Sequence, residues 1–361
     1  MPIVANSCRT FPCGGVSSHT WSMDENEKGT RAATIYDVAR AAGVSASTVS
    51  RAFARPGRVS FATAERIREV AAEIGYRSME MRRPMAKGSR RRGTIALVIA
   101  DISNPVYFEM IRGAEEEAAK NGYTMLLAHT RESGVIEREA LERSMDIVDG
   151  IVLSSSRMSD AAIRSMAKQK PVIVMNRGVS GVASVVTDNE RGVHQAVEHL
   201  HDLGHRSIAY LAGPEASWAN GMRWRSLKLA AAEFGIKTHF FEPGGPTMAS
   251  GAAIAKKVLG SSASAVLAYN DQLAIGFMRQ ALASGLRVPA DISIIGFDNS
   301  SDAELVTPGL TSVAAPLHAL GSAAVRNLLA IARGTSDVPE RPVVLPARLV
   351  VRDSTGKPKL R

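Results

Sequence analysis

The stretch from Thr34 to Tyr76 constrains this chain more than any other, because it has the pattern of three short helices. Thr34 can cap a first helix, apolar residues follow at helical spacing, and Gly43 ends that helix as a C-terminal glycine does. Ser45 can cap a second helix and Ser60 a third. Two helices around a glycine turn, with small polar residues and an arginine on the second, indicate a DNA-reading helix-turn-helix. A small structural three-helix bundle is the alternative.

The helical periodicity of this stretch also predicts which of its side chains form a core. In the second helix Val49 and Phe53 face inward, and the outward face is left to Ala46, Ser47, Ser50 and Arg51. In the third helix the buried side is expected to consist of Ile67, Val70, Ala71 and Ile74.

The positive charge of the 361-residue chain is concentrated in the same region. The formal net charge is +9, and residues 31–92 alone carry 14 Lys+Arg against 5 Asp+Glu, a net of +9. Residues 1–30 carry 2 against 3, and residues 93–361 carry 28 against 27, so both parts are almost neutral. A polyanion partner for residues 31–92 follows, and phosphate neutralisation makes such binding salt-dependent.

The N-terminal residues 1–30 are rich in Ser, Gly, Thr and Asn, which predicts a disordered extension. They have no apolar run long enough for a signal peptide, and we interpret Met23 as the true start. Both cysteines, Cys8 and Cys13, lie here without the spacing of a metal motif, so no metal site and no cofactor are expected. The rest of the chain has no cysteine, which fits the reducing cytoplasm. No run of residues approaches the ~18 apolar residues that a membrane span needs.

From Gly93 onward apolar strands alternate with amphipathic helices, which predicts an α/β region of doubly wound parallel sheets. The expected strands are TIALVIA (94–100), YTMLLA (123–128), GIVLS (150–154), PVIVM (171–175), SVVT (184–187), SIAYLAG (207–213), THFFE (238–242), SAVLAYN (264–270), ISIIGF (292–297), LTSV (310–313) and VVLPARLVVR (343–352). Helices are expected between these strands at 106–120, 136–148, 160–169, 190–203 and 317–333. Two such series imply two lobes, and ligands bind beyond the carboxyl ends of strands in such sheets.

The chain is therefore expected to divide into four segments. These are the extension 1–30, the helix-turn-helix domain 31–77, a basic hinge or linker 78–92, and a two-lobed core 93–361.

In combination, these features resemble the LacI/GalR family of bacterial transcriptional repressors from residue 33 onward. The resemblance rests on TIYDVARAAGVSASTVSRAF, DISNPVYFEMIRGAEEEAAKNGY, VTDNERGVHQAVEHLHDLGHRSIAYLAG, SWANGMR, AYNDQLAIGFMRQALASGLRVPADISIIGFDN and LTSV, in this order and spacing. It implies an all-α helix-turn-helix headpiece, a hinge, and a two-lobed, periplasmic-binding-protein-like core that binds an effector and dimerises. It also implies that the chain crosses between the lobes near 204–207, 314–316 and 335–341.

The function that the resemblance implies is sequence-specific repression of transcription, without enzymatic activity. A homodimer on a pseudo-palindromic operator is expected, since one headpiece covers too few base pairs for selectivity. A small polar effector, with a sugar or sugar acid favoured, is expected to change operator affinity allosterically. The alternative is a solute-binding protein of a sugar transport system, which shares the core fold but should have a signal peptide and no basic headpiece.

Carried over to this sequence, the family's recognition helix places Ala46, Ser47 and Arg51 at base edges. Arg51 can hold guanine through O6 and N7. Phosphate contacts are expected from Thr34, Tyr36, Ser45, Thr48 and Ser50, with headpiece packing as the alternative for Tyr36.

The hinge departs from the family pattern at residues 78–85. Arg83 is retained, Met85 replaces the family's leucine, and Pro84 stands between them. Because an interior proline removes an N–H donor, we expect a shortened or distorted hinge in which Met85 is a weak minor-groove wedge. An unstructured basic linker is the alternative.

The candidates for effector binding are residues that match the family at the ends of the core strands. They are Asp101, Asn104, Phe108, Asn176, Arg177, Asp188, Ser217, Trp218, Arg223, Asn270, Phe297 and Asp298. Carboxylates and amides bind hydroxyls, aromatic faces stack on sugar rings, and the Arg223 fork can grip a carboxylate or hydroxyls. Asp101 and Asn104 could equally be turn and cap residues, Trp218 could pack between the lobes, and Asp271 fits a helix cap better than a ligand contact.

The sequence lacks the motifs of the common α/β enzymes. It has neither a P-loop nor a G-x-G-x-x-G after the first core strand, and no G-x-S-x-G elbow. His194, His201 and His205 lie close in sequence, but without evident carboxylate or cysteine partners they indicate a solvated helix face rather than a metal site.

Overall fold

A computed structural model of the chain describes residues 33–54, 59–74, 76, 92–339 and 341–359. It separates into two compact units, residues 1–89 and 90–361, and each unit is described by itself. The expected disordered extension, the proposed start at Met23, and the hinge residues Arg83 and Met85 lie outside the described residues.

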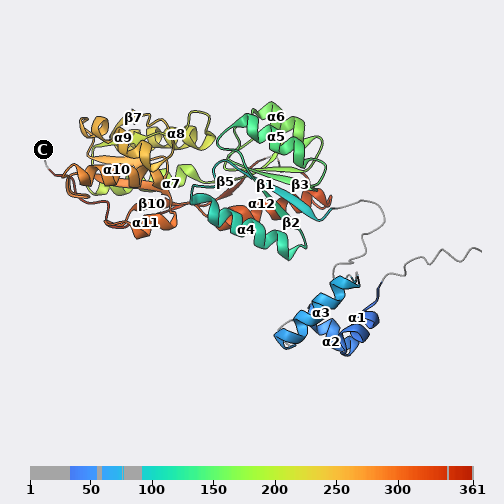
Figure 1. The fold of residues 1–361 in the computed structure, drawn as a ribbon. Coiled ribbons are helices and arrows are strands. Elements are labelled where there is room, and N and C mark those ends of the chain that lie inside the picture. Colours follow the sequence, from blue (N-terminus) through green and yellow to red (C-terminus); the bar gives the residue numbers. More distant parts are fainter. Residues whose placement is uncertain (1–32, 55–58, 75, 77–91, 340, 360–361) are drawn as a thin grey trace, which may run out of the picture. The chain divides into compact units, whose positions relative to one another are not determined.

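The first unit contains the three expected helices, α1 (Ile35–Ala42), α2 (Ala46–Ala54) and α3 (Phe61–Glu73) (Figure 1). At the start of α1 the Asp37 carboxylate accepts hydrogen bonds from the Thr34 N–H at 2.8 Å and the Thr34 hydroxyl at 2.6 Å. Gly43 ends this helix with φ +67°, a left-handed conformation that suits glycine. At the start of α2 the hydroxyl oxygen of Ser45 accepts a hydrogen bond from the Thr48 N–H.

The core of this unit joins all three helices around Val38, Val49 and Ile67, which are fully buried. Phe53 packs against this core beside Tyr76, with their ring centroids 6.0 Å apart. The expected inward face of α2 is therefore confirmed. The prediction that Ile74 is buried is wrong, because α3 ends at Glu73 and Ile74 is 36% exposed.

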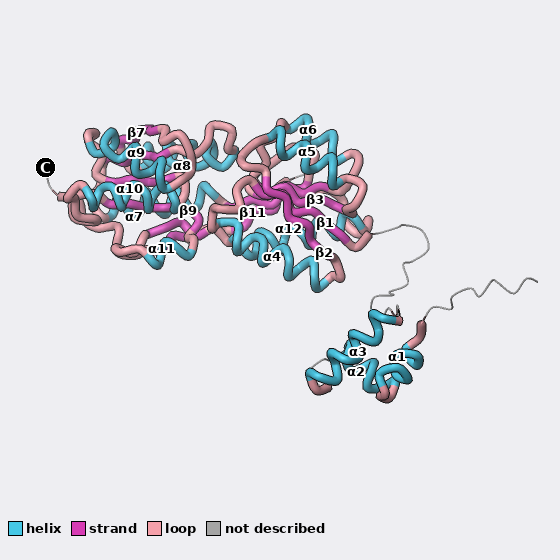
Figure 2. Tube along the Cα trace, viewed as in Figure 1, coloured by secondary structure: helices cyan, strands magenta, loops and turns pink. Residues whose placement is uncertain are grey.

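The second unit contains two six-stranded sheets, each covered by helices on both faces (Figure 2). Sheet 1 has the order β11-β5-β4-β3-β1-β2, and sheet 2 has the order β12-β10-β9-β8-β6-β7. All strand pairs are parallel except β10 with β12. We call the half built on sheet 1 lobe 1 and the half built on sheet 2 lobe 2.

Lobe 1 takes most of its elements from the first half of the core. Its strands are β1 (Thr94–Ile99), β2 (Thr124–His129), β3 (Gly150–Ser154), β4 (Val172–Met175), β5 (Ala183–Thr187) and β11 (Val343–Leu345). One face of the sheet packs on α4 (Val106–Lys120) and α12 (Leu317–Ala332), and the other on α5 (Gly134–Ser144) and α6 (Asp160–Ala167). Burial on both faces explains the nearly continuous apolar sequences of β1, β3, β4 and β5.

Lobe 2 repeats this arrangement. Its strands are β6 (Ser207–Leu211), β7 (Lys237–Phe241), β8 (Ala265–Ala268), β9 (Ser293–Asp298), β10 (Thr311–Ala314) and β12 (Arg348–Val350). One face packs on α9 (Met248–Leu259) and α10 (Asp271–Ala283), and the other on α7 (Asn189–Asp202) and α8 (Trp218–Glu233). The short helix α11 (Ser301–Leu305) follows β9 and was not expected from the sequence.

The crossings between the lobes correct two of the three expected positions. Helix α7 packs on sheet 2, so the chain leaves lobe 1 at Asp188 and not at 204–207. The return between β10 and α12 falls at residues 314–317, as expected. The last crossing lies at residues 345–348 and not at 335–341, because β11 pairs in sheet 1 and β12 in sheet 2. The strand expected at 343–352 is therefore two strands.

Two helix pairs approach so closely that glycine is required at their contacts. A Cβ on Gly321 of α12 would lie 2.1 Å from the Met110 carbonyl oxygen of α4, and one on Gly113 would lie 2.0 Å from the His318 carbonyl oxygen. Gly251 and Gly276 make the same kind of approach between α9 and α10. Because these neighbours are backbone atoms, they cannot yield without moving a helix.

Gly321→Ala is therefore expected to lower the free energy of unfolding by about 1–3 kcal/mol through overpacking. Gly221→Ala is the matched control, because Gly221 is also inside a helix but has no atom within 4 Å of the added Cβ. The control should leave stability unchanged or raise it by up to about 1 kcal/mol. Urea unfolding of both variants measures the difference, and equal stability of the two would contradict the close approach of α4 and α12.

Candidate functional site

A cavity of ≈ 30 Å³ lies between the two lobes, at the carboxyl ends of strands from both sheets. Lobe 1 contributes Asn104, Val106, Tyr107, Met110, Glu132, Ser155 and Asn176, and lobe 2 contributes Ala219, Arg223, Pro246, Tyr269, Asn270 and Asp298. Such a volume holds only one or two water molecules. A sugar-sized ligand therefore requires the lobes or their side chains to move apart.

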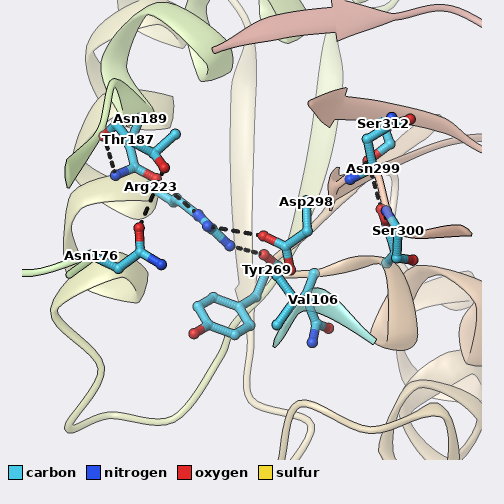
Figure 3. Close-up of polar contacts among 12 residues, drawn as sticks. Val106, Asn176, Thr187, Asn189, Arg223, Tyr269, Asp298, Asn299, Ser300 and Ser312 are labelled. Carbon is cyan, nitrogen blue, oxygen red and sulfur yellow. Dashed lines mark hydrogen bonds and ion pairs between the residues drawn. The ribbon is translucent and has the colours of Figure 1, made fainter. Parts of the chain in front are cut away.

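Arg223 is the centre of the polar contacts in this cavity (Figure 3). Its Nε donates to the Asn189 side-chain oxygen at 3.0 Å, and one terminal nitrogen donates to the carbonyl oxygen of Tyr269. The other terminal nitrogen donates to Oδ1 of Asp298 at 3.3 Å. Asn189 is held in turn, since its amide donates to the Thr187 carbonyl oxygen. A guanidinium that is only 6% exposed is thus fixed by three partners.

Two aromatic rings support the same guanidinium. Its central carbon lies 3.4 Å from the ring centroid of Phe297 and 4.9 Å from that of Tyr269. Phe297 is fully buried in the core of lobe 2 and does not line the cavity. The structure therefore places this predicted stacking residue against Arg223.

The turn after β9 fixes the carboxylate of Asp298. Asp298 has φ +103° and Asn299 has φ +55°, conformations that non-glycine residues rarely adopt. The Ser312 hydroxyl oxygen accepts the Asn299 N–H at 3.0 Å and its O–H donates to Asp271 at 2.6 Å. The other Asp271 oxygen accepts the Ser300 N–H at 2.7 Å. Ser312 and Asp271 thus accept the two amide N–H groups that follow Asp298. The expectation that Asp271 caps a helix is wrong, because Asn270 is the cap of α10 and Asp271 holds this turn instead.

Burial perturbs both carboxyl groups of this turn. Desolvation, together with the nearby negative charge of Asp298, raises the pKa of Asp271 to about 7. Desolvation also raises the pKa of Asp298 to about 6, although Arg223 opposes this shift. Both groups bind a proton more tightly in the folded protein than in the unfolded chain.

A raised folded-state pKa gives a stability contribution that is complete below the unfolded pKa and is lost as pH rises. For Asp271 the loss is expected between pH about 4 and pH about 7. Asp271→Asn should flatten the pH dependence of the free energy of unfolding across this window. Urea unfolding at a series of pH values checks this, and an unchanged slope in the variant would show that Asp271 titrates normally.

The wall from lobe 1 contains two of the predicted amides. The Asn104 side-chain oxygen accepts the Val106 N–H at 3.1 Å, so Asn104 serves the start of α4 as well as the cavity. Asn176 has φ +57°, and its side-chain oxygen accepts the Thr187 hydroxyl at 3.3 Å. On lobe 2, Asn270 caps α10 by accepting the Leu273 N–H at 3.0 Å.

Eight lining residues were not predicted from the sequence, namely Val106, Tyr107, Met110, Glu132, Ser155, Ala219, Pro246 and Tyr269. Glu132 forms an ion pair with the buried Arg157 at 2.5 Å. Glu132 and Ser155 both have positive φ, at +58° and +56°. Their positions in loops after β2 and β3 match the rule that sites form beyond strand ends, which was the available signal.

Besides Phe297, six predicted residues do not line the cavity, namely Asp101, Phe108, Arg177, Asp188, Ser217 and Trp218. The Asp101 carboxylate accepts the Ser103 N–H and hydroxyl, as in the turn alternative. Phe108 points outward from α4 with 54% exposure. Arg177 donates to the carbonyl oxygens of Ser156 and Met158 and pairs with Asp160. Asp188 and Ser217 are side-chain caps of α7 and α8, and Trp218 begins α8.

The outward face of α2 carries most of the predicted DNA-binding residues of the first unit. The Ser45 hydroxyl lies 2.9 Å from that of Ser47 and 2.8 Å from that of Thr48. Arg51 folds back along the helix, where its guanidinium donates to the Ser47 carbonyl at 3.1 Å and to its hydroxyl at 3.2 Å. Ser45, Ser47, Ser50 and Arg51 are exposed. A basic side chain and several hydroxyls thus share one accessible surface.

Two other residues of this unit depart from their expected surroundings. Ala46 is partly buried and packs against the three-helix core, so only part of its methyl group is accessible. Tyr36 is 69% exposed, which argues against the packing alternative for this side chain. Thr34 is half-buried because its hydroxyl serves the cap of α1.

Within the described ranges, no group of three or more His, Cys, Asp or Glu side chains could hold a metal ion. The Nε2 atom of His194 lies 3.2 Å from Glu233, and the buried His205 contacts the Ser264 and Ser293 hydroxyls. Among the helices that the structure describes, none has the length and apolar character needed to cross a bilayer.

The sequence matches two known families. Residues 34–78 match the bacterial regulatory proteins of the lacI family, and residues 197–355 match the periplasmic binding protein-like domain. The HTH-type transcriptional regulator DegA of Bacillus subtilis (strain 168) is 35% identical over 339 residues, covering 90% of this chain and 98% of DegA. The transcriptional repressor CytR of Escherichia coli (strain K12) is 32% identical over 332 residues, covering 90% and 96%.

Solved structures resemble the chain over the same extent. The lac repressor dimer bound to operator and the anti-inducer ONPF aligns with a TM-score of 0.71 and 27% identity, over 90% of this chain and 100% of that one. The complex of the transcriptional regulator CelR with cellobiose aligns with a TM-score of 0.67 and 29% identity, over 89% and 99%.

Proposed function

This chain belongs to the LacI family of bacterial regulatory proteins, and on that premise we propose that a small polar metabolite controls its affinity for operator DNA. The proposal rests mainly on the cavity between the lobes, which is lined by Asn176 from lobe 1 and by Arg223 and Asp298 from lobe 2. A ligand that contacts both lobes binds one lobe arrangement better than another and shifts the population toward it. Once the lobes have moved apart, the polar lining of this cavity suits a sugar, and the CelR structure contains one, cellobiose.

The DNA-binding half of the proposal rests on the exposed face of α2. We propose that Ser47 and Arg51 contact base edges, with a smaller contribution from the partly buried Ala46. Thr34, Tyr36, Ser45, Thr48 and Ser50 are proposed to contact phosphates, which position the helix without reading sequence. Arg51 must leave its contacts with Ser47 to reach a guanine.

A homodimer on a pseudo-palindromic site completes the proposal. The helix-turn-helix of one chain reads few base pairs, and two headpieces at a fixed spacing multiply the selectivity. Residues 78–92 are proposed as the hinge that joins each headpiece to the core, with Arg83 and Met85 at the minor groove. Coupling between effector and operator is a shared free energy, so operator DNA must alter effector affinity by the same factor.

Selection of binding sites from a random DNA pool tests the DNA-binding proposal. The full-length protein should enrich a sequence with two related half-sites about one helical turn apart, or a multiple of it. Enrichment should weaken steeply with added salt because Lys and Arg displace counterions from the phosphates. A pool that remains random after repeated rounds would contradict sequence-specific binding and would favour the solute-transport alternative.

A further inference from the structure

We propose that the effector is an uncharged, hydroxyl-rich molecule, and that a sugar acid or a phosphate ester is rejected. The inference rests on the proposed function, because it concerns the cavity between the lobes. It narrows the ligand class by the balance of charge in that cavity.

Three charged side chains line the cavity, namely Glu132, Arg223 and Asp298, and their formal charges sum to −1. Arg223 is already engaged, since it lies 3.3 Å from Asp298. Glu132 is also paired, because Arg157 lies 2.5 Å from it and has a side chain that is only 7% exposed. Counting Arg157 brings the sum to zero, so the described residues of this cavity offer an anion no uncommitted positive charge.

The ionisation of Asp298 is part of this balance. Burial raises its pKa to about 6, which still leaves it mainly ionised beside Arg223 at neutral pH. A carboxylate or phosphate in the cavity would therefore have to compete with Asp298 for Arg223 and with Glu132 for Arg157, close to both negative groups and in a site with little water. Like charges brought together in such a site weaken binding by orders of magnitude.

The same groups suit an uncharged polyol. The carboxylates of Glu132 and Asp298 are acceptors, and hydroxyl groups can donate to them. Arg223 uses three of its N–H directions on Asn189, Tyr269 and Asp298, which leaves donors for ligand oxygens.

The apolar lining suits the carbon side of such a molecule. Val106 and Met110 come from α4, and the Tyr107 and Tyr269 rings lie on opposite lobes. Desolvation raises the pKa of Tyr107, so its phenol stays neutral and adds no charge. Aromatic and aliphatic walls with a few fixed polar groups are the usual setting for a neutral sugar.

Thermal unfolding of the full-length protein with charge-separated metabolites tests the inference. A small-molecule extract of the bacterium that carries this gene is divided by ion exchange into uncharged, anionic and cationic fractions. The uncharged fraction should raise Tm, because a ligand that binds only the folded state stabilises it. The anionic fraction should need at least about 100-fold higher concentration for the same rise.

Stabilisation by the anionic or cationic fraction, without stabilisation by the uncharged one, would overturn the inference and leave the proposed function intact. No stabilisation by any fraction would contradict the proposed function itself, and the inference with it. The two failures are therefore distinguishable.

Glu132→Gln tests the charge balance separately, because it removes one negative charge and leaves Arg157 unpaired. The variant should acquire a Tm rise with the anionic fraction that the wild-type protein lacks. Glu139→Gln is the matched control, since Glu139 pairs with Arg143 on the exposed side of α5 and lies outside the cavity. Identical selectivity of wild type and Glu132→Gln would overturn the inference.

Discussion

Replacing Arg223 by methionine is expected to lower the free energy of unfolding by about 3–5 kcal/mol, because it leaves the buried carboxylate of Asp298 without its cation. The side-chain oxygen of Asn189 and the carbonyl oxygen of Tyr269 also lose their donors. The deficit should shrink as pH falls, since an unpaired Asp298 can then take up a proton. Urea unfolding at pH 5 and pH 8 measures both effects.

Two further variants make this result specific. Asp298→Asn in the Arg223→Met background should recover part of the lost stability, because it removes the unpaired charge. Arg287→Met is the matched surface control, since Arg287 pairs with Asp291 at 3.2 Å but is 64% exposed, and its loss should leave Tm unchanged. Equal losses for Arg223→Met and Arg287→Met would show that the buried pair has no special weight.

Replacing Arg51 by alanine is expected to cost about 1–3 kcal/mol of operator binding at each half-site, which is roughly 5–150-fold in affinity for each half-site. The loss should be specific to the selected operator, because a bidentate contact to guanine reads sequence while phosphate contacts do not. Since Arg51 is exposed and, among the described residues, its hydrogen bonds go to Ser47 alone, stability should change little. Fluorescence anisotropy with operator and with random DNA of equal length measures the two affinities.

Arg68→Ala is the matched control for Arg51→Ala. Arg68 lies on α3, where it pairs with Glu65 at 3.1 Å and is 44% exposed at its side chain. The Arg68→Ala variant also removes one positive charge from the headpiece, so it should weaken binding to operator and to random DNA slightly and equally. If Arg51→Ala also weakened operator and random DNA equally, Arg51 would be a phosphate contact and not a base reader.

The regular parts of the fold were predictable because their physical signals are local. The central strands are buried on both faces and appear as apolar runs, and each expected strand from 94 to 313 falls within a few residues of an observed one. The stretch 343–352 was not predictable in this way. Its division into β11 and β12 depends on two different partner strands, β5 and β10, which a local pattern does not contain. The packing of α7 on sheet 2 is non-local for the same reason.

The cavity was predictable in part. Asn104, Asn176, Arg223, Asn270 and Asp298 were expected and do line it. The three asparagines follow strands, Asp298 ends β9, and Arg223 lies in the second turn of α8, the helix after β6. Glu132 and Ser155 depend on left-handed backbone conformations that direct loop side chains inward, and those conformations are not visible in the residue types.

Which residue at the end of β9 faces the cavity could not be predicted from the sequence. Phe297 and Asp298 are adjacent, and neighbouring strand residues point to opposite faces of a sheet. Phe297 therefore enters the core beneath Arg223, while Asp298 reaches the cavity. Both residues contribute to the site, but only one of them can touch a ligand.

The central claim is that a metabolite bound between the lobes changes the affinity of the headpiece for DNA. The most direct measurement is an anisotropy titration of the selected operator with the full-length protein, with and without the stabilising metabolite fraction. The operator Kd should change by about 5–150-fold, the usual range of allosteric coupling. Titration curves that coincide with and without a fraction that raises Tm would contradict the claim.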